Sequence, residues 1–181
     1  ANLADHYRDI AVIAFLTPPA EADADPIPLR ITTSTPVADP AVLCDHNGDT
    51  AVTLPNPTPD QPAWVAYEFA APVTVRSAFV ACSGSNWLRD GELQCSDDGT
   101  TWRTVHPLAR ITLWDRFAPC TTALPETRAR CFRFVFTSAM YFARHFQPAE
   151  LRLSPRARLD HWETQTAVVP ALVPAAEPVS V

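Results

Sequence analysis

Short runs of alternating apolar and polar residues dominate the chain, the pattern typical of half-buried β-strands. The clearest pair surrounds an Asp-Gly turn: residues 92–96 precede Asp98-Gly99, and residues 102–108 follow it. Asp-Gly favours a tight turn because glycine takes a positive φ without a Cβ clash and the aspartate side chain bonds to nearby backbone. These positions therefore predict a β-hairpin.

Further strands are predicted at regular spacing on both sides of this hairpin. The main runs are 64–69, 73–81, 111–117, 130–137 and 149–153, with shorter ones at 10–15, 29–35 and 157–162. No long amphipathic pattern supports a helix, and 19 prolines disfavour one. The spacing predicts an all-β sandwich of jelly-roll type, with no helix longer than about three turns.

The length of 181 residues suits one domain with peripheral segments. We predict an N-terminal strand and Pro/Asp-rich loop at 1–28, the sandwich at 29–163, and a Pro/Ala-rich linker or tail at 164–181. The chain begins with Ala1 and shows no basic-then-apolar leader, so we expect a processed protein or a piece of a longer one. No apolar run is long enough for a membrane span, so no membrane partner is expected.

Composition and charge narrow the function classes. Hydrophobic residues make up 47% and charged residues 19%, which is typical of a globular protein. The net charge of −6 argues against nucleic acid as a partner. The five cysteines show no CxxC spacing, which argues against zinc. We expect buried thiols with at most one disulfide, for which Cys82–Cys95 is the candidate.

Motifs for catalysis are absent from the sequence. The four glycines cannot form a nucleotide-binding loop or a nucleophile elbow. Asp97 and Asp98 are adjacent on the predicted turn, where carboxylates are normally solvated turn formers and not a glycosidase pair. A binding role is therefore expected, without enzymatic activity of this chain alone.

Five segments in the same order resemble discoidin-like modules, also called coagulation factor 5/8 type C or galactose-binding-like modules. They are residues 45–50, 64–76, 96–102, 129–136 and 149–153. The resemblance implies a β-sandwich that binds ligands, most often sugars. The flanking phrases 6–15, 50–55 and 157–163 are similar to the accessory sandwich domain of bacterial α-L-rhamnosidase-type enzymes, glycoside hydrolase family 106. That similarity implies a secreted or periplasmic bacterial protein with an adjacent catalytic domain.

The family resemblance also implies a structural calcium ion beside the first loop. The matching positions are Asp45, Asn47, Thr50 and, from the last strand, Glu150. Calcium prefers six to eight oxygen ligands from carboxylates and carbonyls. His46 replaces the family's central glycine, which conflicts with the tight geometry of that loop. The alternative is that Asp45 and Thr50 cap a turn while Glu150 pairs with an arginine.

Sugar sites combine an aromatic ring, on which a pyranose packs, with polar side chains for its hydroxyl groups. Three predicted loops combine an aromatic residue with arginine, and their candidate ligand-binding residues are Asn86, Trp87, Arg89, Trp114, Tyr141, Arg144 and His145. The alternatives are that Trp114 is a core residue and that Tyr141 packs on a neighbouring domain. Trp64 and Trp102 are predicted core residues because they lie inside strand patterns.

The sequence thus predicts a non-catalytic, carbohydrate-binding accessory module of an α-L-rhamnosidase-type glycoside hydrolase. One alternative is a structural domain that docks on the same enzyme and binds no sugar. Another is an independent lectin or adhesion module. Exposed aromatic loops beside polar residues favour sugar binding, whereas loops covered by the rest of an enzyme favour docking.

Overall fold

The computed structural model describes residues 24–83, 88–109, 119–139 and 144–161. The strands are β1 (Arg30–Thr33), β2 (Leu54–Pro55), β3 (Ala63–Cys82), β4 (Leu88–Ser96), β5 (Arg103–Pro107), β6 (Cys120–Ala139), β7 (His145–Phe146) and β8 (Pro148–Ser154). The one helical element in this described part is a short 3-10 helix, η1 (Pro40–Cys44). The all-β prediction is therefore confirmed.

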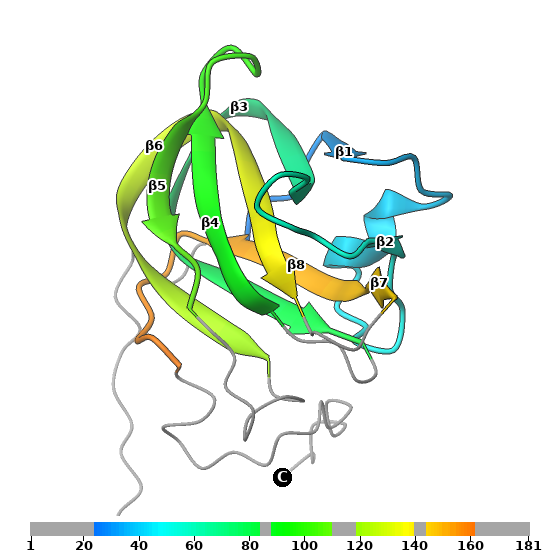
Figure 1. The fold of residues 1–181 in the computed structure, drawn as a ribbon. Helices are drawn as coiled ribbons and strands as arrows, with labels where there is room; N and C mark the ends of the chain where they lie inside the picture. The colour runs from blue at the N-terminus through cyan, green and yellow to red at the C-terminus, as the bar shows by residue number, and fades with distance from the viewer. Residues whose placement is uncertain (1–23, 84–87, 110–118, 140–143, 162–181) are drawn as a thin grey trace, which may run out of the picture.

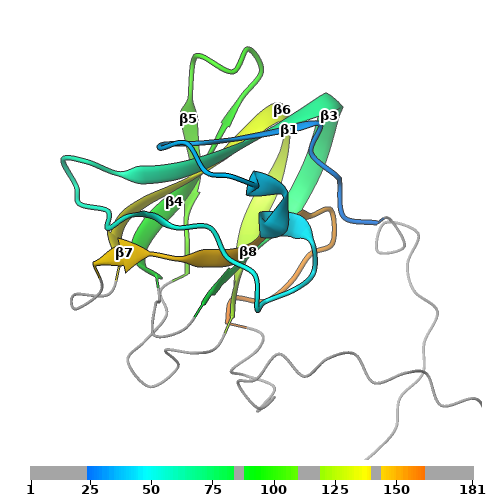
Figure 2. The same cartoon turned by 90° about the vertical axis from the view of Figure 1, so that its right-hand side faces the viewer.

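Two long, bent strands, β3 and β6, run antiparallel through both halves of the sandwich (Figure 1). Their pairing shifts register twice, between Glu68 and Val73 and between Val75 and Ser77. The first half of β3 pairs with β1 and its second half with β8, which gives the order β1-β3-β6-β4-β5 with β8 attached to β3. Figure 2, in which the view is turned by 90°, shows η1 and β8 beside each other on the side away from β5.

The core lies between the two halves and follows the alternation of the strands. Along the start of β3, Val65, Tyr67 and Phe69 point inward, and Phe132 and Phe134 of β6 meet them. Tyr67 is buried, yet its hydroxyl group donates a hydrogen bond to the carbonyl of Leu151 at 2.8 Å, which satisfies its polar atom.

The β4–β5 hairpin forms as its sequence predicts. Gly99 has a φ of +74°, and the Asp98 carboxylate accepts bonds from the backbone N–H groups of Thr100 and Thr101, both at 2.7 Å. These bonds, with one from the Ser96 hydroxyl, hold the pKa of Asp98 well below its ordinary value. The carboxylate therefore builds the turn.

Several element predictions need correction. Residues 64–69 and 73–81 belong to one strand, because the pairing with β6 resumes after a bulge and does not end at Pro72. Strand β6 begins ten residues before the predicted 130–137 segment. Residues 157–161 form no strand. The predicted strands at 10–15 and 111–117 lie outside the described residues.

The prediction that Trp64 and Trp102 are core residues is wrong. Trp64 alternates with the buried Ala63 and Val65, so its ring points to the outer face of the sheet, and both rings are only half-buried. The Arg133 guanidinium carbon lies 4.4 Å from the centroid of Trp102 and 5.8 Å from that of Trp64. We call these three residues the tryptophan stack. The cation–π contact with Arg133 stabilises these two rings on the outer face of the sheet, although the sequence pattern predicted that they lie in the interior.

The cysteine pairing is also corrected. None of the five cysteines forms a disulfide. Cys82 lies beside Pro148 at one end of the sandwich, whereas Cys95 pairs with Phe132 toward the other end. Since a disulfide requires Cα atoms within about 7 Å, Cys82 and Cys95 cannot be bridged in this fold. Burial raises the pKa of Cys82 to about 12, which keeps this thiol protonated.

Candidate functional site

Three segments that carry predicted sugar-binding residues join the sandwich at one end. Leu88 at the start of β4 pairs with Ala139 at the end of β6, and the backbone N–H of Ala109 bonds to the Thr122 hydroxyl at 2.8 Å. The end of β3 lies there too, because Ser83 N–H bonds to the Gln147 carbonyl at 2.9 Å. We call this the loop end, the lower end in Figure 1. Segments far apart in the sequence therefore start and finish close together.

The predicted ligand residues divide into two groups. Asn86, Trp87, Trp114 and Tyr141 lie outside the described residues. Arg89, Arg144 and His145 are described and all three are exposed. His145 is fixed by its pairing with Pro55, and Arg89 directly follows the paired Leu88. Guanidinium and imidazole groups at exposed strand ends can donate hydrogen bonds to ligand hydroxyl or carboxylate oxygens.

The predicted metal residues come together beside the first loop. Asp45 ends η1, and its carboxylate accepts bonds from Asn47 N–H and from the Thr50 hydroxyl, both at 2.8 Å. His46 has a φ of 62°, so the loop keeps the backbone form that normally favours glycine. The loop geometry is thus retained despite the substitution. The turn-capping alternative for Asp45 and Thr50 is equally visible in these bonds.

Glu150 completes this set from β8 and is not explained by turn capping. Glu150 is only 3% exposed, and no hydrogen bond of ordinary geometry reaches either carboxylate oxygen, although the backbone N–H groups of His46 and Asn47 lie close enough to lower its pKa. Arg152 forms only a long ion pair with it, at 3.7 Å from Nε to Oε1. Burial, reinforced by the nearby Asp45 charge and opposed by Arg152, raises the pKa of Glu150 to about 7. A buried carboxylate with so few close polar partners is energetically costly unless a closer cation or a proton compensates it.

These donors fit calcium better than a transition metal. The described residues contain no cluster of three or more His, Cys, Asp or Glu side chains suited to a metal ion. The set of two carboxylates, an amide and a hydroxyl, namely Asp45, Glu150, Asn47 and Thr50, supplies only hard oxygen donors once Asn47 contributes its carbonyl. A calcium site also draws on backbone carbonyls.

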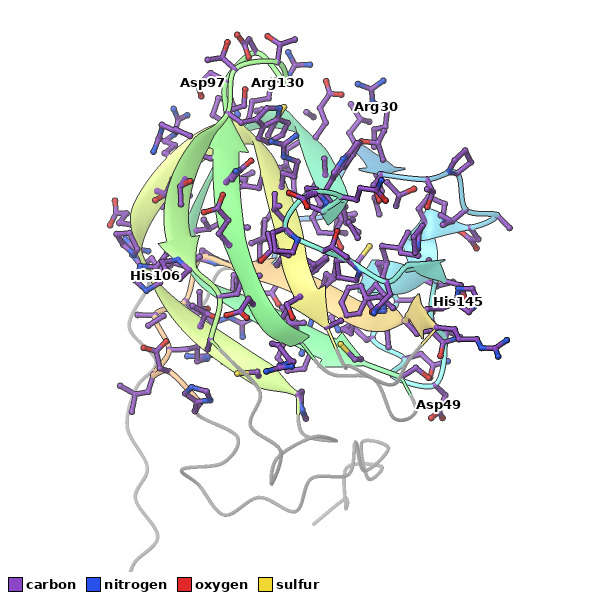
Figure 3. The ribbon with its side chains drawn as sticks, in the orientation of Figure 1. Arg30, Asp49, Asp97, His106, Arg130 and His145 are labelled. Atoms are coloured by element: carbon purple, nitrogen blue, oxygen red, sulfur yellow. The ribbon has the colours of Figure 1, made fainter. Side chains whose placement is uncertain are left out.

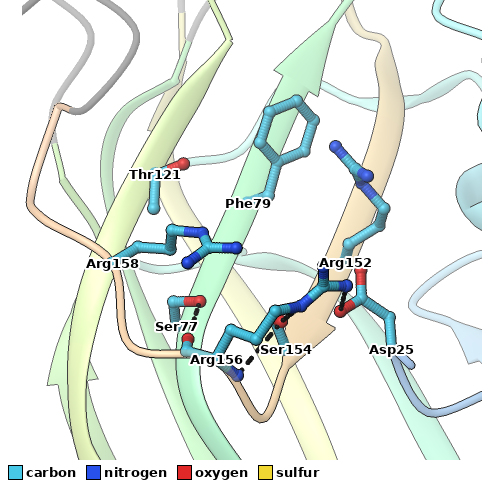
Figure 4. A pocket seen from close by; sticks show the side chains of 8 residues that line it. All are labelled: Asp25, Ser77, Phe79, Thr121, Arg152, Ser154, Arg156 and Arg158. Atoms are coloured by element: carbon cyan, nitrogen blue, oxygen red, sulfur yellow. Dashed lines mark hydrogen bonds and ion pairs between the residues drawn. The ribbon is translucent and has the colours of Figure 1, made fainter. Parts of the chain in front are cut away.

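A separate pocket of about 230 Å³ lies on the outer face of β3 and β8 (Figure 4). Arg152, Arg156 and Arg158 line it together with Asp25 and Phe79. Arg156 bonds to Asp25 at 2.9 Å, and the Arg152 guanidinium lies 4.2 Å from the Phe79 ring centroid. Arginine clusters suit carboxylate groups. This arginine pocket was not predicted from the sequence, although the arginines at positions 152, 156 and 158, on and after the last strand, were a signal for it.

Comparison with known proteins supports the fold. No protein-family model matches the chain, and no curated protein matches it. Among solved structures, it resembles the CBM32 module of AlyQ, solved in complex with 4,5-unsaturated mannuronic acid. That match has a TM-score of 0.58 and 14% identity, and it covers 72% of this chain and 98% of that one.

Two further structures extend the comparison. A rhamnosidase from Novosphingobium sp. PP1Y matches with a TM-score of 0.59 and 24% identity, covering 79% of this chain but only 12% of that chain. A pectin-binding carbohydrate-binding module matches with a TM-score of 0.57 and 14% identity, covering 74% of this chain and 95% of that one. The chain therefore has the discoidin-like β-sandwich fold shared by carbohydrate-binding modules, some of which are parts of larger enzymes.

Proposed function

We propose that this chain is a non-catalytic carbohydrate-binding module that accompanies an α-L-rhamnosidase-type glycoside hydrolase in a secreted or periplasmic bacterial protein. The observation that carries the proposal is the loop end. There, a fold shared with carbohydrate-binding modules brings together the attachment points of three segments that each combine aromatic residues with arginine.

The chemistry at the loop end suits sugar recognition. Trp87, Tyr141 and Trp114 carry the kind of aromatic ring on which the C–H side of a pyranose packs. Arg89, Arg144 and His145 offer donors for hydroxyl and carboxylate oxygens, with Asn86 as a further polar partner. The likeness to part of a rhamnosidase makes rhamnose-containing pectic chains the first ligands to test.

Two other functions stay open to experiment. A domain that docks on its own catalytic domain without binding sugar would present the same fold. An independent lectin or adhesion module would bind sugar without an enzyme beside it.

No helix in the described residues has the length and apolar character needed to cross a membrane.

Calorimetric titration of the isolated chain with rhamnogalacturonan oligosaccharides tests the proposal. We expect Kd values near 1 mM, about −4 kcal/mol, because the proposed contact packs one aromatic ring on one sugar ring. Trp87→Ala should abolish the heat of binding without changing the melting temperature. Ile27→Ala, which truncates a side chain that is 87% exposed elsewhere, is the matched control and should bind normally.

The contrary outcomes separate the alternatives. Absence of binding to every oligosaccharide would favour the docking domain. Unchanged binding in Trp87→Ala would remove the loop end from the proposal. Hydrolysis of any glycoside by the purified chain would contradict both the binding-module and the docking-domain assignments.

We further propose that Asp45, Asn47, Thr50 and Glu150 hold a structural calcium ion. The support is the buried Glu150 carboxylate, which no hydrogen bond of ordinary geometry reaches and which lies beside the loop of residues 45–50 with its oxygen donors. Calcium bound only by the folded chain would raise its stability by mass action. Chelator should therefore lower the melting temperature of the wild type but not that of Asp45→Ala. Asp49→Ala, an exposed change in the same loop, should respond like the wild type.

A further inference from the structure

A groove of about 230 Å³ crosses the outer face of the sheet at the end opposite the loop end. Its lining includes Thr32, Ala66, Glu68, Asp97, Trp102 and Arg130, and we call it the hairpin groove. Three of its residues, Arg30, Asp97 and Arg130, gather around the β4–β5 turn at the top of Figure 3, away from His145 and Asp49. All the lining residues named here belong to the described part of the chain.

The depth of the groove comes from small residues between larger ones. Thr32 on β1 pairs with Ala66 on β3, and the neighbouring Cys131 on β6 is largely buried. The half-buried Trp102 stands at the β5 side. Small side chains on adjacent strands therefore leave a trough with an indole ring along one side.

The Trp102 ring is held in place without a ligand. Arg133 covers it at 4.4 Å within the tryptophan stack, while neither Arg133 nor Trp64 lines the groove. Trp102 therefore belongs both to the tryptophan stack and to the lining of the groove. A ring already fixed loses little conformational entropy when a ligand packs on it, which favours binding.

The polar groups of the groove are also preorganised and nearly balanced in charge. The Glu68 carboxylate joins Arg30 at 2.6 Å and Arg130 at 2.8 Å. The positive charges of these two arginines are nearly balanced by the carboxylates of Glu68, Asp97 and Asp98. Such a surface attracts neither strong anions nor strong cations, but its fixed donors and acceptors can pair with hydroxyl groups.

We propose that the hairpin groove is a second carbohydrate site, which takes one neutral pyranose ring of a polysaccharide. Its volume is below the ~300–1,000 Å³ of pockets for drug-sized ligands, so a single ring fits better than a longer segment. The site is independent of the loop end and goes beyond the function proposed for it. Two sites at opposite ends would let one module hold two chains or two distant points of one chain.

A contact with a second copy of the chain is the competing occupant. Protein interfaces centre on buried apolar and aromatic groups. The exposed large hydrophobic residues among the described ones are Ile27, Leu29 and Leu159, and none of them lines the groove. One indole among ion-paired and hydroxyl groups is the composition of a sugar site more than of a protein interface.

NMR titration of the full chain tests the proposal through the indole N–H signal of Trp102. The probes are neutral hexasaccharides from β-1,4-galactan, cellulose and mannan, with a galacturonate hexasaccharide as the charged comparison. We expect at least one neutral probe to shift this signal saturably at millimolar concentration, with a smaller shift from galacturonate. Thr32→Trp should fill the trough and reduce the shift at least tenfold. Ala41→Trp, an exposed change on η1, is the control and should leave it unchanged.

The variants separate this proposal from the loop-end function. If Trp102 responds in Trp87→Ala as in the wild type, the groove binds independently. The second site is overturned if no neutral probe shifts the Trp102 signal. It is also overturned if the Trp102 signal of Thr32→Trp shifts with the same apparent affinity as in the wild type. Both outcomes hold independently of binding at the loop end. Movement of the Trp102 signal on raising protein concentration without sugar would assign the face to contact between copies and also overturn it.

Discussion

The Glu150 carboxyl is buried with few close polar partners. No hydrogen bond of ordinary geometry reaches its oxygens, and burial raises its pKa from 4.5 to about 7, although the backbone N–H groups of His46 and Asn47 oppose the rise. The sequence could place Glu150 near the Asp45 loop only through the family resemblance, because β8 and the loop are a hundred residues apart. Its burial depends on how β8 packs against η1, which no local pattern encodes.

Glu150 should make the metal-free protein sensitive to pH. The folded state holds the proton up to about pH 7 while the unfolded state releases it near pH 4.5, so this contribution to stability is present at low pH and falls as pH rises between these values. Urea unfolding in chelator at pH 5 and pH 8 should show wild-type stability falling relative to that of Glu150→Gln. Calcium should remove most of the difference at pH 8.

The same urea experiment can refute this assignment. If the wild type and Glu150→Gln show parallel pH dependence in chelator, the Glu150 carboxyl does not titrate in the folded state as its burial implies. A matched variant, Glu126→Gln, changes an exposed carboxylate ion-paired to Arg76 and should follow the wild type.

At the scale of elements, the sequence pattern predicts strands well and their limits poorly. The Asp98-Gly99 hairpin was predictable because its turn chemistry is local. The continuity of β3 through Pro72 was not, since a bulge restores pairing with β6 only in the folded sheet. Alternation likewise could not decide which face of β3 is inner, and Trp64 was therefore assigned to the wrong side.

Gly91 fixes how closely β4 approaches β6. A Cβ at this position would meet the carbonyl oxygen of Val135 at 2.7 Å, and backbone cannot move away as a flexible side chain can. Gly91→Ala should destabilise the chain by about 1–3 kcal/mol, the usual range for overpacking. Chemical denaturation measures this loss.

The control for Gly91→Ala lies in the exposed turn of the same hairpin. Thr100→Ala leaves the Thr100 backbone N–H to Asp98 intact, so it should change stability little. Equal stability of Gly91→Ala and the wild type would mean that the two strands can separate at this point without cost.

At the scale of the whole molecule, the bent β3 and β6 strands separate two ends, each of which carries one of the proposed binding sites. The loop end gathers the termini of three strands, and the opposite end carries the hairpin and its groove (Figures 1 and 3). The sequence predicted the loop-end candidates because aromatic and arginine residues cluster locally in three predicted loops. The hairpin groove and the arginine pocket combine residues from distant strands, so only the packed structure shows them.

Carbohydrate binding at the loop end is the central claim, and NMR mapping with rhamnogalacturonan oligosaccharides tests it most directly. We predict saturable shifts of the backbone amide signals of Arg89, Arg144 and His145, with the shifts lost in Trp87→Ala and kept in Ile27→Ala. Shifts confined to the arginine pocket or the hairpin groove, or no shift at any concentration of oligosaccharide, would contradict it.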